Sequence, residues 1–104
     1  MKSESSLPKI AETIAEFGDV KLIIFTGLFV EKETPVDLVI VGPIDKEKLT
    51  NYLNNDLQTK RAVRFTTMTE EDFKYRLKYK DKFIMDIVKD PDSVIPLKKL
   101  DLDL

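Results

Sequence analysis

The sequence predicts a small α+β domain in which helices cover a mixed β-sheet. Apolar residues recur at helical spacing in some segments and run continuously or alternate in other, short ones. The nine residues 27–35 between the first two apolar runs are too few for a parallel crossover, so this strand pair is expected to be antiparallel. The predicted order is helix, strand, strand, helix, strand, helix, helix, with a last short strand left open.

The first element is predicted to be a helix over about residues 6–17. One of its faces collects apolar residues at helical spacing, namely Leu7, Ile10, Ala11, Ile14 and Ala15. Ser5 or Ser6 is expected to cap this helix, and Pro8 to lie in its first turn. Gly18 is expected to end it by adopting a left-handed conformation.

Three runs indicate strands. Residues 20–26 are rich in β-branched and aromatic side chains and predict a central strand, followed by a loop over residues 27–35. Residues 36–41 predict its neighbour, closed by a Gly-Pro pair. Residues 62–68 alternate and predict a third, less buried strand. Val94 and Ile95 are compatible with a short edge strand before Pro96.

Three more helices are predicted after the second strand. Asp45 can cap a helix over about residues 46–57, and Thr69 can open one over about residues 70–79. Asp81 can cap a further short helix, whose apolar face would carry Phe83, Ile84, Ile87 and Val88. These segments contain no linker or internal repeat, so residues 1–104 are expected to form one domain, with a frayed tail over about residues 98–104.

Composition excludes several kinds of chemistry. The 104 residues contain no cysteine and no histidine, which excludes thiol nucleophiles, disulfides and histidine-based triads. The net charge of −2 argues against a domain that mainly binds phosphate backbones, so nucleic acid is not an expected partner. No run is long enough to span a membrane, and no secretory signal precedes the first helix, so a cytoplasmic location is expected.

Asp37 is the main candidate for a functional residue, because it is a charged residue at the start of an apolar strand. It is either a solvated or turn-capping aspartate or a metal carboxylate at a strand end. A magnesium site for phosphoryl chemistry needs more than one carboxylate. Glu31 and Glu33 lie in the preceding loop and could supply one, although a solvated loop explains them equally.

The Thr26-Gly27 pair, the loop after it and residues 36–42 together resemble the core of the nucleotidyltransferase (DNA polymerase β-like) superfamily, in its minimal branch. Residues 68–73, 76–77 and 81–87 are similar to the closing helices of that branch, and about residues 5–97 are covered. The individual motifs are short, so their order and spacing carry the resemblance. It implies a nucleotidyltransferase-like fold.

In active members of that superfamily, a Gly-Ser pair holds the nucleotide phosphates, and an Asp-x-Asp pair with a third carboxylate binds Mg²⁺. Here Gly27 matches the glycine, but Leu28 replaces the serine. Pro35 replaces the first aspartate, and Asp37 alone matches the second. Residues 57–68 offer no third carboxylate, and Arg64 is a cation there. The resemblance therefore implies a catalytically degenerate domain, with Gly27, Leu28 and Asp37 as the remnant of its site.

Three functions stay open on this basis. The first is a non-catalytic regulatory or protein-interaction module without a cofactor, for which the chain does not reveal the protein partner. The second is an active enzyme that moves a nucleotide from an NTP to a partner protein, using Mg²⁺, Asp37 and a surrogate such as Glu31 or Glu33. The third is a nucleotide-binding sensor. A homodimer through an exposed strand edge is compatible with each.

Two further features each have more than one interpretation. The basic run Lys74, Arg76, Lys78, Lys80 and Lys82, with two interleaved tyrosines, is either a solvated helix face balanced by acidic residues or a nucleic-acid contact. Residues 28–30 are either part of the core or fill a vacated nucleotide pocket, or they form an apolar docking patch.

Overall fold

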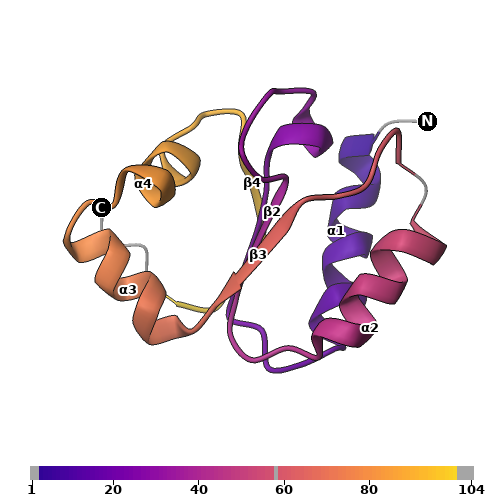
Figure 1. Ribbon diagram of the computed structural model, residues 1–104, viewed down its shortest axis with the longest axis horizontal. Coiled ribbons are helices and arrows are strands. Elements are labelled where there is room, and N and C mark those ends of the chain that lie inside the picture. Colours follow the sequence, from indigo (N-terminus) through magenta and orange to yellow (C-terminus); the bar gives the residue numbers. More distant parts are fainter. Residues whose placement is uncertain (1–2, 58, 101–104) are drawn as a thin grey trace.

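The computed structural model describes residues 3–57 and 59–100, which form three layers with a four-stranded sheet in the middle. Two helices cover each face of the sheet (Figure 1): α1 (Ser3–Ala15) and α2 (Lys46–Asn51) on one, α3 (Glu70–Lys78) and α4 (Lys82–Val88) on the other. The predicted α+β class and the predicted order of elements are confirmed, and the last short strand is present.

The sheet has the strand order β3-β2-β1-β4 and is mixed. Its strands are β1 (Leu22–Phe25), β2 (Leu38–Val41), β3 (Phe65–Met68) and β4 (Val94–Lys98). The pairing of β1 with β2 is antiparallel, as predicted from the short connection. β4 is antiparallel to β1, and β3 is parallel to β2 after the crossover through α2. β1 and β2 are therefore central, and β3 and β4 are the edges.

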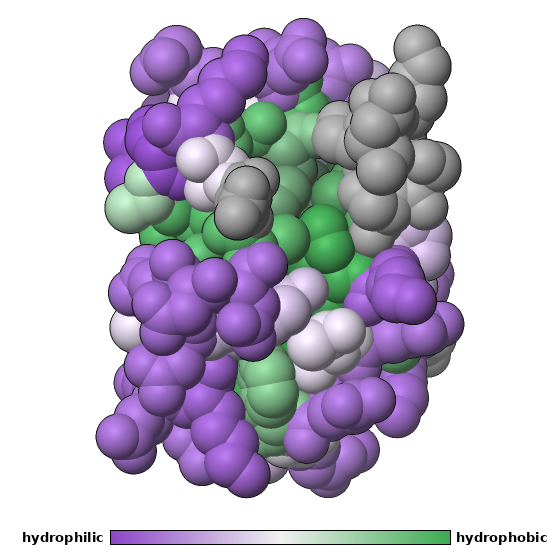
Figure 2. All heavy atoms as spheres, turned by 90° about the vertical axis from the view of Figure 1, so that its right-hand side faces the viewer, coloured by the Kyte–Doolittle hydropathy of each residue, from purple (hydrophilic) through white to green (hydrophobic). Residues whose placement is uncertain are grey.

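Because helices cover both faces, the central strands are apolar on both sides. Ile23 and Phe25 of β1 face α1 and α2, whereas Leu22 and Ile24 face α3 and α4. All four side chains are fully buried. Figure 2 looks onto the face formed by α1 and α2 and shows hydrophobic side chains between the polar outer surfaces of these helices. The core thus consists of two apolar layers, one on each side of the sheet.

Helix α1 differs from its prediction at both ends. It begins at Ser3, so Ser5 and Ser6 lie inside it and not at the predicted capping position, and Pro8 lies beyond its first turn. The helix ends at Ala15. Gly18 does not act through a left-handed conformation; it bridges Ile44, and a Cβ there would collide with the Pro43 carbonyl oxygen. The glycine is required for close approach of two backbones.

The predicted caps of the later helices are confirmed. The Asp45 carboxylate accepts from the N–H groups of Glu47 and Lys48, each at 3.1 Å. The Thr69 hydroxyl accepts from Asp72 N at 2.9 Å, and the Asp81 carboxylate accepts from Ile84 N at 3.1 Å. These acceptors satisfy backbone donors that would otherwise lack partners at the start of each helix.

Helix α2 is shorter than the predicted 46–57 segment. The chain continues as a π-helical segment, η2 (Tyr52–Asp56), and the N–H of Leu57 donates to the Tyr52 carbonyl at 3.0 Å. Leu49 and Leu53 are both buried against the sheet, as their spacing predicts. The wider turn therefore changes the backbone hydrogen bonds of this segment but keeps its apolar side toward the core.

The two edge strands also differ from their predicted bounds. β3 begins at Phe65, three residues later than predicted. The carbonyl oxygen of Arg64, just before it, accepts a hydrogen bond from the N–H of Asp37, just before β2. β4 continues past Pro96 to Lys98, which an edge strand allows. Lys98 and the buried Leu100 contradict the expected fraying at the start of the tail; residues 101–104 lie outside the described residues. Among the described helices, none has the length and apolar character needed to cross a membrane.

Candidate functional site

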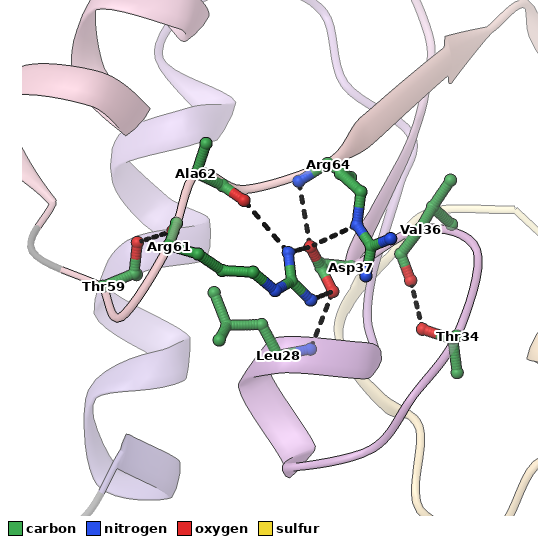
Figure 3. A network of polar contacts seen from close by, with 8 residues as sticks. All are labelled: Leu28, Thr34, Val36, Asp37, Thr59, Arg61, Ala62 and Arg64. Atoms are coloured by element: carbon green, nitrogen blue, oxygen red, sulfur yellow. Dashed lines mark hydrogen bonds and ion pairs between the residues drawn. The ribbon is translucent and has the colours of Figure 1, made fainter.

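Three loop segments meet at one end of the sheet (Figure 3). The 3₁₀ turn η1 (Gly27–Val30) follows β1, Asp37 precedes β2, and Arg61 and Arg64 precede β3. The topology brings them together, because β1 is antiparallel to β2 and β2 is parallel to β3. The end of β1 therefore lies beside the starts of the other two strands.

The Asp37 carboxylate is the centre of this site and is fully buried. Arg61 binds it with both ends of its guanidinium, Nη1 to Oδ2 at 2.7 Å and Nη2 to Oδ1 at 2.9 Å. The backbone N–H of Leu28 donates to Oδ1 at 2.8 Å, and that of Arg64 donates to Oδ2 at 2.9 Å. Each oxygen thus accepts two hydrogen bonds, which fills the roughly four acceptor positions of a carboxylate.

These contacts also fix the charge state of Asp37. Burial by itself raises the pKa of the carboxyl, but the hydrogen bonds from Arg61 and from the backbone N–H groups of Arg64 and Leu28 outweigh it. The pKa falls from its ordinary value of 3.8 to about 2. Asp37 is therefore an anion at neutral pH, held by a bidentate arginine and two amides.

This low pKa predicts an acid-dependent loss of stability. A carboxyl with a depressed folded-state pKa stabilises the protein above its unfolded pKa, and the contribution fades as the pH falls through the folded pKa. We expect Asp37 to contribute about 2 kcal/mol at neutral pH, lost progressively from pH 3.8 down to about 2. Urea unfolding of the wild type and of Asp37→Asn, followed against pH, measures this. The difference in free energy of unfolding between the two proteins should narrow as the pH falls from 3.8 to about 2. A difference that does not change with pH would contradict the assignment.

The residues predicted as the remnant of a nucleotide site are brought together. Gly27 has φ +52°, and a Cβ there would collide with Asp37 Oδ1. Leu28 contributes its backbone N–H to Asp37, and its side chain packs against the core. Phe29 is buried, with its ring centroid 4.7 Å from that of Phe25. The core interpretation of residues 28 and 29 is confirmed, and the loop predicted over residues 27–35 begins as a 3₁₀ turn.

Thr26, directly before this turn, is buried as well. Its N–H donates to the Asp37 carbonyl oxygen at 2.9 Å, and the Asp37 N–H donates to the Arg64 carbonyl oxygen at 2.7 Å. The Thr26 hydroxyl has no hydrogen-bond partner in the part of the chain that the structure describes. The backbone of Asp37 therefore joins the turn after β1 to the segment before β3, and its side chain joins the same two segments again.

Arg61 is the residue that sequence reasoning missed. It lies in an irregular segment with no recognisable motif, and only its pairing with Asp37 reveals its role. Its Nη1 also donates to the Ala62 carbonyl oxygen at 3.0 Å. Arg64 Nε lies 3.6 Å from Asp37 Oδ2, so a second cation faces the carboxylate from the side where the resemblance requires a third acid. The prediction of a solvated Asp37 is wrong, whereas the turn-capping alternative agrees with the hydrogen bond that its carboxylate accepts from the Leu28 N–H of η1.

The two loop glutamates are not drawn into the site. Glu31 and Glu33 are both exposed. Between them, Lys32 Nζ lies 2.7 Å from Asp90 Oδ2 and 3.1 Å from Asp92 Oδ2, which ties the loop to the segment between α4 and β4. Within residues 3–57 and 59–100, no group of three or more acidic side chains is arranged to hold a metal ion.

Three of the five cations in the basic run on α3 and the start of α4 pair with acids. Lys74 pairs with Glu70 at 2.9 Å. Arg76 lies between Asp72 and Asp81, and Lys82 pairs with Asp86 at 3.1 Å. The two interleaved tyrosines are exposed, and their ring centroids are 4.7 Å apart. This arrangement supports a solvated, salt-bridged helix face.

Comparisons with known proteins add no relative to this description. The chain matches no protein-family model, no curated protein and no solved structure.

Proposed function

We propose that this chain is a catalytically inactive nucleotidyltransferase-like domain that acts as a regulatory or protein-interaction module. One observation carries the proposal: the Asp37 carboxylate, which would be the surviving metal ligand, is saturated by the protein's own donors. Mg²⁺ gives up its water reluctantly and needs anionic oxygens with free lone pairs. To bind here it would have to displace the bidentate guanidinium of Arg61 from a buried carboxylate.

The surrounding charge supports the same conclusion. Two guanidinium groups face Asp37, so a cation approaching the carboxylate meets like charge. Leu28 offers one backbone N–H where the resemblance calls for a phosphate-binding serine, and that N–H already donates to Asp37. The group that would hold a nucleotide and the group that would hold its metal are thus bound to each other.

The proposal places the chain in the cytoplasm on its cysteine-free composition and gives it a protein rather than a nucleic-acid partner. The net charge of −2 and the ion pairs along α3 disfavour contact with a phosphate backbone. The module would retain a helix-covered sheet and use its outer surfaces for contact.

A nucleotide titration tests the proposal, because binding must precede any transfer and needs no partner protein. The isotope-labelled chain is titrated with each NTP, with and without Mg²⁺, and backbone amide shifts are followed. We expect no saturable shifts at residues 27–30 or Asp37. Saturable shifts there without consumption of the NTP would favour a nucleotide sensor. Shifts with Mg²⁺-dependent release of pyrophosphate, abolished by Asp37→Asn and retained in Asp86→Asn, would establish an active enzyme.

A further inference from the structure

The two edges of the sheet are protected to different degrees. β4 contains Pro96, which has no N–H, carries the exposed Lys98, and pairs with β1 through an irregular register. Such features block the addition of another strand. β3 has the sequence Phe-Thr-Thr-Met, with no proline, glycine or charge. β3 is the last strand on its side of the sheet (Figure 1), so no described strand pairs with its outer edge, and its four residues are half-buried.

The main-chain groups on this outer edge can be identified. The Met68 carbonyl accepts from Gly42 N at 2.9 Å, so the polar groups of Met68 point toward β2. Successive residues of a strand present these groups to opposite sides, which directs those of Thr66 inward as well. Phe65 and Thr67 then point their N–H and C=O groups away from β2. Two donors and two acceptors therefore have no strand partner within residues 3–57 and 59–100 and can pair with another strand.

The charges on either side of β3 have opposite signs. Lys60, Arg61 and Arg64 precede the strand, and Glu70, Glu71 and Asp72 follow it. Within the described part of the chain, Lys60 and Glu71 take part in no ion pair, and both are exposed. An antiparallel second copy places the basic end of each strand beside the acidic end of the other. A parallel copy would place like charges together.

We propose that β3 is a homodimer interface, in which two copies of this chain pair antiparallel about a twofold axis at Thr66. Phe65 of each copy then exchanges main-chain hydrogen bonds with Thr67 of the other, giving roughly four such bonds. The two sheets join into one continuous sheet, and Lys60 of each copy lies near Glu71 of the other. The interface is self-complementary, as a twofold axis requires. The dimer does not depend on whether a nucleotide binds near Asp37.

Sedimentation from micromolar to millimolar concentration tests the dimer, with two matched sets of variants. Thr67→Pro removes an outward N–H and should weaken association at least tenfold, whereas Thr67→Val keeps the N–H and should not. Glu71→Lys and Lys60→Glu should each weaken association about tenfold, and the double swap should restore it. A chain that stays monomeric, a dimer unaffected by Thr67→Pro, or a double swap without recovery would each overturn the proposal.

Amide hydrogen exchange provides a readout that does not depend on how Thr67→Pro folds. In the wild type, the amides of Phe65 and Thr67 should exchange more slowly as the protein concentration rises. The Thr66 amide, which faces β2, should be protected at every concentration. Exchange at Phe65 and Thr67 that does not change with concentration would contradict the interface.

Discussion

Asp37→Ala is expected to lower the free energy of unfolding by about 4 kcal/mol. The substitution leaves the partly buried N–H groups of Leu28 and Arg64 without their acceptors and removes the partner of Arg61. It also disconnects η1 from the segment before β3. Urea unfolding at neutral pH measures the loss.

Asp86→Ala is the control for this substitution. Asp86 is an exposed aspartate that forms one ion pair with Lys82, on the same helix. Exposed pairs of this kind contribute little, so the variant should unfold within about 0.5 kcal/mol of the wild type. Equal effects of the two substitutions would show that the contacts of Asp37 do not stabilise the fold.

Gly27→Ala is expected to destabilise the protein by about 3 kcal/mol. Gly27 is buried with φ +52°, a backbone conformation that is strained for alanine. The added Cβ would also lie 2.9 Å from the Val36 carbonyl oxygen and collide with the Asp37 carboxylate. Unfolding in urea gives the magnitude, and the acid-dependent part of the stability should shrink with it because Asp37 is displaced.

Glu31→Gly is the control within the same turn. Glu31 has φ 58° but is exposed at the end of η1, so glycine relieves backbone strain there while it loosens the unfolded chain. These effects oppose each other, and stability should stay within about 1 kcal/mol. A harmless Gly27→Ala would mean that the turn can move away from Asp37, contrary to a rigid saturated site.

Local patterns of the sequence predict much of the fold. The antiparallel pairing of β1 with β2 follows from a short connection, and the caps at Asp45, Thr69 and Asp81 follow from short-range side-chain chemistry. Predictions that depend on distant partners fail. Gly18 is set by its contact with the segment at Pro43, and β4 passes through Pro96 because it lies at an edge.

At the candidate site, too, the contacts between residues far apart in the sequence could not be predicted. The sequence singles out Asp37 as a charge in an apolar strand and identifies Gly27 and Leu28 beside it. It does not indicate that a guanidinium 24 residues away binds the carboxylate. That contact depends on the parallel placement of β3 beside β2, which no local pattern encodes. An aspartate that resembles a metal ligand in sequence thus becomes, in the structure, the acceptor that joins three loops.

A titration with paramagnetic Mn²⁺ shows whether the Asp37 carboxylate is occupied by the protein's own donors or can bind a metal ion. Mn²⁺ favours the same oxygen ligands as Mg²⁺ and broadens the signals of nearby amides. We expect the amides of Leu28 and Arg64, which donate to Asp37, to keep their line widths at Mn²⁺ concentrations that already broaden signals near exposed carboxylates. Selective, saturable broadening of these two amides, lost in Asp37→Asn, would contradict it and show that Asp37 is a working metal ligand.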